Sequence, residues 1–333
     1  MTFSDIDIDT MILILTLNPL LERRFHYKKL NLSSVNRYGI VNYQAGGKGI
    51  NVSRQLKKLG IDSFNLFFSG GNNGKIFRDL LRKENLNFSF INIEQEIREA
   101  AIIISEEEEK VYSFFSSNPV IIDKEINQMK LSLNKIIPNI EMIVISGSSP
   151  FEEAEEIIEY AILEANKYDK VVLCDYYGKN LSKVFSLSPT IIHNNFDEIE
   201  NYLGVSLENE NLIIDFLKSL YQKGIKRVYL TNGEKTFYAQ NFDYLYKVFP
   251  PKVKYIDSTG SGDAFVAGLI YCWKNNEIFE LSVKFSSSLG AINAARFDVC
   301  NVEKSEIEDL IDKVNIVPVG KKIKIINDKP TFH

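Results

Sequence analysis

Short apolar segments alternate with longer helical stretches along most of this chain, and this rhythm constrains its fold more than any other feature. The apolar segments have the length of strands buried on both faces, and the helical stretches suit crossover connections between parallel strands. The pattern predicts an α/β fold in which helices cover both faces of a mostly parallel sheet. The predicted strands are Met11–Leu17, Ser63–Phe68, Met142–Ser146, Lys170–Cys174, Thr190–His193 and Arg227–Thr231. The predicted helices are Gly49–Leu59, Lys75–Glu84, Phe151–Ala165, Asp197–Leu203, Leu212–Lys223 and Ala264–Lys274.

Two insertions, at about 23–43 and about 93–116, depart from this rhythm and read as extended chain. The second contains two apolar runs, Ala100–Ile104 and Val111–Phe115, on either side of the glutamates 106–109. This arrangement predicts a hairpin with an acidic, solvated turn. The polar residues 1–10 read as a loose extension, so we expect one domain over 11–333. The basic segment Lys321–Lys324 suggests an extra strand or a tail, and no function follows from it.

Composition excludes several functional classes. The chain has 333 residues, of which 45% are hydrophobic, enough to bury a large core in one α/β domain. The net charge of −5 and the absence of a basic block argue against a nucleic-acid or membrane-surface role. The apolar run Met11–Leu15 is too short to span a bilayer or to act as a signal segment. Three scattered cysteines without metal-ligand spacing are typical of reduced core cysteines in a cytoplasmic protein.

The segment Asp257–Phe265 places a glycine-rich turn and a carboxylate at the start of an apolar helix. Unpaired amides at a helix start form an anion site, and Gly260 and Gly262 permit close backbone approach. Such a turn beside an acid suits phosphoryl transfer, with Asp263 as the base and the amides of Gly260, Ser261 and Gly262 as the anion hole. Because a helix N-terminus makes a carboxylate a weaker base, we expect position to matter more than basicity. Taken alone, the segment slightly favours a plain capped helix over an anion site.

A second motif, Ala45–Arg54, reads as two glycines followed by a helix whose polar face carries Lys48 and Asn51. A cation and an amide near a helix start suit a polyhydroxylated or phosphorylated ligand. The segment is not a Walker A loop, because Gly49 follows the lysine where Ser or Thr is required. Nor is Gly260–Phe265 a dinucleotide fingerprint, since it lacks the third glycine and lies too late in the chain.

Together the two motifs resemble the signatures of the PfkB family, the ribokinase-like sugar kinases: Gly46–Val52 matches the N-terminal one and Asp257–Asp263 the C-terminal one. The resemblance runs from about Met11 to about Val302. It implies a ribokinase-like three-layer α/β/α fold, in which the two insertions form a small β lid that often pairs with a second subunit's lid. Four further segments resemble the hexose-phosphate branch, which contains 1-phosphofructokinase and tagatose-6-phosphate kinase: Thr16–Pro19, Val35–Arg37, Ser146–Pro150 and Pro250–Val253.

The resemblance implies a nucleotide site with ATP and Mg²⁺. Asn195 and Glu198 match a family motif whose glutamate organises Mg²⁺, usually through water, although acids also favour a first helical turn. Thr231 and Gly233 match a nucleotide-binding turn, and Asn293 either bonds the base or caps a helix contact. His193 stands where the branch usually has a lysine, and it reads more readily as a strand-end histidine than as a catalyst.

The acceptor site departs further from the family. Glu22 occupies the place of an aspartate that grips sugar hydroxyls, and the lid retains Arg98 but has Ala100 where the family has asparagine. Arg98, Lys48 and Arg37 are the expected phosphate ligands, with a solvated lid charge as the alternative for Arg37. Gly46, Gly47 and Asn51 complete the predicted acceptor site.

These residues predict an ATP-dependent kinase acting on a ketohexose phosphate, with fructose 1-phosphate the first choice and tagatose 6-phosphate or fructose 6-phosphate the alternatives. An unphosphorylated sugar or nucleoside follows if the cationic cluster is incomplete. A catalytically weakened sugar-phosphate sensor is the alternative from a different class, and a dinucleotide-binding oxidoreductase is a distant third.

Overall fold

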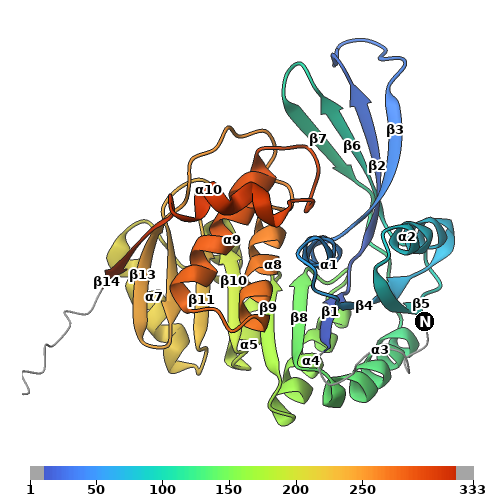
Figure 1. Ribbon diagram of the computed structural model, residues 1–333. Coiled ribbons are helices and arrows are strands. Elements are labelled where there is room, and N and C mark those ends of the chain that lie inside the picture. Colours follow the sequence, from blue (N-terminus) through green and yellow to red (C-terminus); the bar gives the residue numbers. More distant parts are fainter. Residues whose placement is uncertain (1–10, 320–333) are drawn as a thin grey trace, which may run out of the picture.

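The computed structural model describes residues 11–319. Ten strands form the main sheet in the order β14-β13-β12-β11-β10-β9-β8-β1-β4-β5 (Figure 1). Their bounds are β1 Ile12–Thr16, β4 Phe64–Ser69, β5 Asn87–Asn92, β8 Met142–Gly147, β9 Val171–Tyr176, β10 Ile191–Asn195, β11 Arg227–Thr231, β12 Phe237–Asn241, β13 Tyr244–Phe249 and β14 Asn315–Val319. All six predicted strands are confirmed.

Seven neighbouring strands of this sheet are parallel, namely β5, β4, β1, β8, β9, β10 and β11. The strands β12, β13 and β14 extend the sheet beyond β11 in antiparallel pairs. β1 lies inside the sheet between β4 and β8 and is wholly buried, with Leu13 opposite Phe64 of β4 and Ile143 of β8. Since parallel strands end at the same edge, the polar residues that follow β1, β8, β9 and β10 converge there.

Helices cover both faces of this sheet, which confirms the three-layer α/β/α architecture. Alternate β1 residues pack to opposite sides: Leu13 and Leu15 into one core, Ile12 and Ile14 into another. The first core includes residues of α2 to α7, and the second includes residues of α1, α8 and α9. The helices are α1 Lys48–Lys58, α2 Gly71–Lys83, α3 Asp123–Ile136, α4 Glu156–Lys167, α5 Leu181–Ser186, α6 Phe196–Leu203, α7 Glu210–Gln222, α8 Ser261–Lys274, α9 Phe279–Ala294 and α10 Glu308–Ile311.

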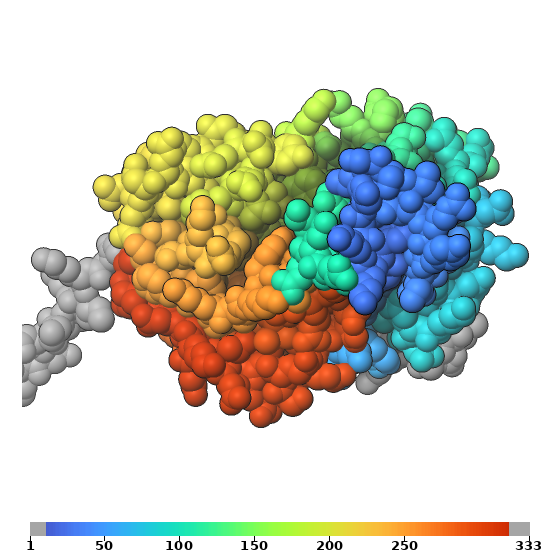
Figure 2. All heavy atoms as spheres, turned by 90° about the horizontal axis from the view of Figure 1, so that it is seen from above, coloured from blue at the N-terminus to red at the C-terminus, as the bar shows by residue number. Residues whose placement is uncertain are grey.

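A separate four-stranded sheet stands above one end of the main sheet (Figure 1). It has the order β3-β2-β6-β7, with β2 Leu20–Tyr27, β3 Ile40–Gly46, β6 Glu99–Ser105 and β7 Lys110–Phe115. The predicted hairpin is confirmed, because β6 and β7 pair antiparallel around residues 106–109. We call this sheet the lid. Seen from above, it lies beside segments from the C-terminal half of the chain (Figure 2); Phe297 packs against its apolar face and Lys254 pairs with Glu109.

The three cysteines are free and buried, as expected. Among residues 11–319, no helix is long and apolar enough to cross a membrane. The predicted extension 1–10 and the basic segment Lys321–Lys324 lie outside the described residues.

Candidate active site

The loop before α8 has the shape expected of an anion site. Gly260 caps the helix in the left-handed region, with φ +76°, and a Cβ there would lie 2.3 Å from a side-chain carbon of Val299. Glycine is therefore required on steric and conformational grounds. Within the described residues, the amides of Gly260 and Gly262 have no hydrogen-bond partner, whereas the amide of Ser261 donates to the carbonyl of Ser258 at 3.0 Å. Two of the three predicted amides are thus available to an anion.

Asp263 lies in the first turn of α8 and is 4% exposed. The Nδ2 atom of Asn51 donates to its Oδ2 atom at 2.8 Å. Asn51 belongs to the first turn of α1, which begins after Gly47 with φ +118°. The two sequence motifs, more than 200 residues apart, therefore meet through one buried hydrogen bond.

Burial raises the pKa of Asp263 from 3.8 to about 7, and the charge of Lys48 opposes this effect while that of Asp175 adds to it. The expectation of a weaker base is wrong, because the helix N-terminus does not compensate for removing the carboxylate from water. A carboxyl group with a pKa near neutrality is well matched to general-base catalysis.

Lys48 is bonded to carboxylates. Its Nζ atom lies 2.9 Å from Oδ1 of Asp175 and 3.5 Å from Oε1 of Glu198. Burial alone would lower the pKa of Lys48, but Asp175, Glu198 and Asp263 raise it well above its ordinary value. Lys48 therefore neutralises the acids of the site, and its expected role as a phosphate ligand has to compete with these ion pairs.

Sequence reasoning missed Asp175, which is wholly buried at the end of β9. Its carboxylate accepts hydrogen bonds from Ser146 at 2.9 Å and from Lys48, and it lies 2.9 Å from Nδ1 of His193. Burial alone would raise its pKa, but Lys48 and His193 lower it. The available signal was an acid that directly follows an apolar strand.

His193 is buried between Asp175 and Thr231, which is in the turn predicted to bind the nucleotide. Its Nε2 atom lies 3.2 Å from Oγ1 of Thr231, and its ring stacks on Phe265 with centroids 5.2 Å apart. A Cβ on Gly262 would lie 3.3 Å from the ring. The histidine therefore links Asp175 to Thr231 through its two ring nitrogens, and its ring packs against Gly262 and Phe265 at the start of α8.

Glu198 lies in the first turn of α6, where it forms a reciprocal cap with Asn195. Its Oε2 atom accepts hydrogen bonds from Nδ2 of Asn194 at 2.9 Å and from the amide of Asn195 at 3.1 Å. Both expectations for this segment are compatible, because the cap uses Oε2 whereas Oε1 turns towards Lys48.

The predicted nucleotide residues divide into two groups. Gly233 follows β11 with φ +56°, and among the described residues other than its two chain neighbours no atom lies within 4 Å of where a Cβ would be, so this turn borders open space. Asn293, by contrast, is 1% exposed and donates to the carbonyl of Thr259 at 2.8 Å and to Oγ of Ser261 at 3.1 Å. Its Oδ1 atom accepts from the amide of Cys300 at 2.7 Å. These contacts favour the expected helix contact over a bond to the base, because Asn293 holds the anion loop in place.

Glu22 lies on β2 at the base of the lid, close to Gly46, where a Cβ would lie 2.5 Å from its Oε1 atom. Its Oε2 atom accepts from Nη1 of Arg24 at 2.8 Å, and Nη2 of Arg24 donates to the carbonyl of Phe297 at 3.0 Å. Both side chains are less than 10% exposed. Arg24, which was not among the residues predicted from the sequence, therefore fixes the position of the Glu22 carboxylate.

The two predicted lid arginines differ in placement. Arg98 donates through Nη2 to the carbonyl of Asn18 at 3.0 Å, and its guanidinium lies 5.7 Å from the ring centre of Phe115. Its Nε atom is buried without a partner, and burial lowers its pKa. Arg37 is exposed in the segment that joins β2 to β3 at the outer end of the lid (Figure 1). The structure thus brings Arg98 to the base of the lid and leaves Arg37 apart from it.

Comparisons with known proteins show the family of the chain. The family described as pfkB family carbohydrate kinase matches residues 22–305. A 1-phosphofructokinase from Borreliella burgdorferi is 28% identical over 307 residues, which cover 92% of this chain and 98% of the relative. A tagatose-6-phosphate kinase from Staphylococcus epidermidis is 26% identical over 315 residues, covering 93% and 100%.

Solved structures share the fold. Phosphofructokinase-2 from Escherichia coli, in complex with potassium, superposes with a TM-score of 0.84 at 22% identity, covering 91% of this chain and 99% of that one. A possible 1-phosphofructokinase from Thermotoga maritima gives a TM-score of 0.82 at 23% identity, covering 93% and 100%.

Proposed function

Because the chain belongs to the PfkB family of carbohydrate kinases, we propose that it transfers the γ-phosphoryl group of ATP to a ketohexose phosphate, with fructose 1-phosphate as the first choice. The product would be fructose 1,6-bisphosphate. The class of enzyme follows from the family and the named relatives: the chain is a sugar-phosphate kinase of the phosphofructokinase and tagatose-6-phosphate kinase type, which is a phosphotransferase with an alcohol group as acceptor. The choice of fructose 1-phosphate follows the relative named 1-phosphofructokinase.

The observation that carries the proposal is the buried carboxyl group of Asp263, with a pKa of about 7, beside the two unpartnered amides of Gly260 and Gly262. In this proposal Asp263 accepts the proton of the acceptor hydroxyl as that oxygen attacks the γ-phosphorus. The two amides stabilise negative charge on the transferred group. Asn51 holds one carboxylate oxygen and leaves the other for the acceptor.

Glu198 fits a magnesium ion that is held largely by water and phosphate oxygens. It is a half-buried acid whose Oε1 atom is not used by the helix cap. Among residues 11–319, no group of three His, Cys, Asp or Glu side chains could hold a metal. Since Mg²⁺ keeps several waters and takes substrate phosphates, one carboxylate acting through water suffices. When bound, the ion supplies charge neutralisation to the phosphates.

The base of the lid supports a phosphorylated acceptor. Within residues 11–319, the buried Nε donor of Arg98 and the buried Oδ1 acceptor of Asn18 have no hydrogen-bond partner. Buried polar atoms without partners are costly, so a ligand that bonds to them gains affinity. Glu22 faces Gly46 and suits sugar hydroxyls. Tagatose 6-phosphate and fructose 6-phosphate remain the alternative acceptors.

The deciding experiment is ATP consumption by the purified chain with Mg²⁺ and each of fructose 1-phosphate, fructose 6-phosphate, tagatose 6-phosphate, ribose and adenosine. Preference for fructose 1-phosphate supports the proposal, and preference for another acceptor reassigns the substrate. Binding of a sugar phosphate without turnover would favour the sensor instead. Asp263→Asn should abolish turnover while retaining binding.

The lid also suggests pairing with a second copy of the chain. Its strands carry large exposed apolar side chains, among them Ile40 (67% exposed), Val41, Tyr43, Phe114 and Phe115 (59% exposed). They lie on β3 and β7, the two edge strands of the lid, and exposed apolar side chains concentrated on one element are typical of interaction surfaces. We therefore propose a homodimer through the lid, to be tested by light scattering on the wild type and on a Phe114→Asp variant.

A further inference from the structure

A line of hydrogen bonds runs from Asp263, in the first turn of α8, to the outer side of α1. Asn51 donates to Asp263 at 2.8 Å, and its Oδ1 atom accepts from Nη1 of Arg54 at 2.8 Å. Arg54 in turn donates to Glu84 through Nε at 2.6 Å and Nη2 at 3.1 Å. Its Nη2 atom also donates to the carbonyl of Ala45 at 2.6 Å.

This line determines which way the amide of Asn51 faces. A guanidinium only donates hydrogen bonds, so the amide atom beside Arg54 must be the oxygen. The amide nitrogen then faces Asp263, whose ionised carboxylate only accepts. Without Arg54, the amide would be free to rotate, and its oxygen could turn towards the carboxylate, where two acceptors repel each other.

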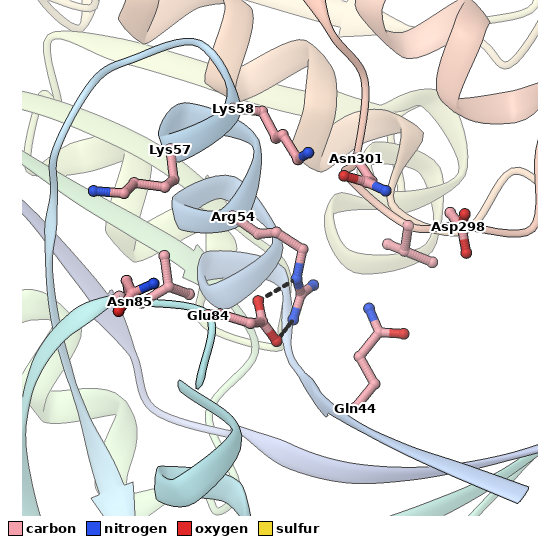
Figure 3. A pocket seen from close by; sticks show the side chains of 10 residues that line it. Gln44, Arg54, Lys57, Lys58, Glu84, Asn85, Asp298 and Asn301 are labelled. Carbon is pink, nitrogen blue, oxygen red and sulfur yellow. Dashed lines mark hydrogen bonds and ion pairs between the residues drawn. The ribbon is translucent and has the colours of Figure 1, made fainter. Parts of the chain in front are cut away.

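Arg54 is itself held firmly. Its side chain is 11% exposed, and that of Glu84, at the C-terminal end of α2, is 28% exposed. A two-bond contact between arginine and carboxylate limits the orientations of the guanidinium. The pair lies beside a cavity of about 520 Å³ (Figure 3), so the outer end of the line is accessible to small solutes.

We propose that Arg54 is a positioning residue for phosphoryl transfer: it orients the amide of Asn51 so that Asp263 keeps one oxygen bonded and presents the other to the acceptor. Glu84 contributes indirectly, because its two hydrogen bonds with Arg54 fix the orientation of the guanidinium. The inference rests on the proposed function, because it takes Asp263 as the base. It adds a residue outside the set that we assigned to binding or catalysis.

The test compares Arg54→Met, Arg54→Lys and Glu84→Gln with the wild type and with Lys58→Met. The control residue lies on the same helix beside the same cavity and forms an exposed ion pair with Glu303. Because small displacements of a catalytic group cost up to about 100-fold in rate, we expect Arg54→Met to lower kcat about tenfold or more, with the KM for ATP unchanged. Arg54→Lys and Glu84→Gln should lie between Arg54→Met and the wild type, and Lys58→Met should match the wild type.

Chemical rescue separates positioning from folding. In Arg54→Ala, added guanidinium can enter through the cavity, and we expect it to restore part of kcat. It should leave the kcat of Lys58→Met at the wild-type value and should not raise the kcat of Asp263→Asn. Thermal unfolding of each variant identifies misfolded protein. Unchanged kcat in a folded Arg54→Met overturns the inference, as does a rise in the KM for the acceptor alone.

Failure of the proposed function gives a different result. If the wild type consumes no ATP with any acceptor, the kinase proposal fails whatever the variants do. A neutron crystal structure of Arg54→Met, which locates the amide deuterons, then tests the geometry directly: an Asn51 amide still bonded to Asp263 through nitrogen overturns the orienting role, and a turned amide supports it.

Discussion

Asp263 should destabilise the fold at neutral pH, and Asp263→Asn should relieve that cost. Burial raises the pKa of this carboxyl from 3.8 to about 7. Between these two pH values the unfolded chain has ionised the group and the folded chain has not, so stability falls as pH rises and then levels off above about pH 7. At about 1.4 kcal/mol per pH unit, the full cost is roughly 4 kcal/mol.

The variant lacks the titration but keeps an oxygen that can accept from Asn51. We expect its free energy of unfolding to exceed that of the wild type by roughly 1.5 kcal/mol at pH 5 and roughly 4 kcal/mol at pH 8.5. The two proteins share Lys48, Asp175 and His193, the other charged or titratable groups that act on this site. A gain in stability that accompanies loss of turnover is expected at a catalytic position.

Urea unfolding followed by circular dichroism at pH 5, 6, 7 and 8.5 measures this difference. Asp215→Asn, which removes an exposed carboxylate from α7, is the matched control and should show no comparable pH dependence. If the stabilities of Asp263→Asn and the wild type run parallel across this range, the argument from burial is refuted.

Three further perturbations test other parts of the site. Lys48→Met leaves the wholly buried Asp175 without its ammonium partner, so the free energy of unfolding should fall by about 3 kcal/mol, as measured by urea unfolding at pH 7. Arg24→Met releases Glu22, and steady-state kinetics should show the KM for the sugar phosphate rising roughly tenfold with that for ATP unchanged; Glu22→Asp in the same background should recover part of the loss. Glu198→Gln should raise the Mg²⁺ concentration needed for half-maximal rate by about tenfold, as seen in a magnesium titration.

Much of the fold was predictable from local pattern. Continuous apolar runs predicted the strands, since a strand buried on both faces has no polar side to display. The acidic turn between two apolar runs predicted the lid hairpin, and two glycine-rich motifs predicted the anion loop and its carboxylate. The strands β12 to β14 and the helix α3 were missed. For β13 and β14 the reason is that few of their side chains are buried, so their apolar pattern is weak.

The electrostatics of the site required the tertiary structure. Asp175 meets Ser146 because β9 lies beside β8 in the sheet, and it meets Lys48 only because α1 begins near the same sheet edge. Arg24 stands two residues from Glu22 on the same strand, but the carbonyl of Phe297 that holds its other nitrogen lies far away in the sequence. The pKa of Asp263 depends on how much water the surrounding elements exclude, which no local motif records.

The sequence by itself determined which residues can carry phosphoryl transfer, because glycines, an acid and helix starts act through short-range geometry. The tertiary structure decided which of them are held, neutralised or left open, because burial and charge pairing join residues that lie far apart in the chain. Asn51 illustrates both: its motif predicted an amide in the site and the turn of α1 places Arg54 three residues on, at one end of that amide, whereas only packing brought Asp263 to the other end.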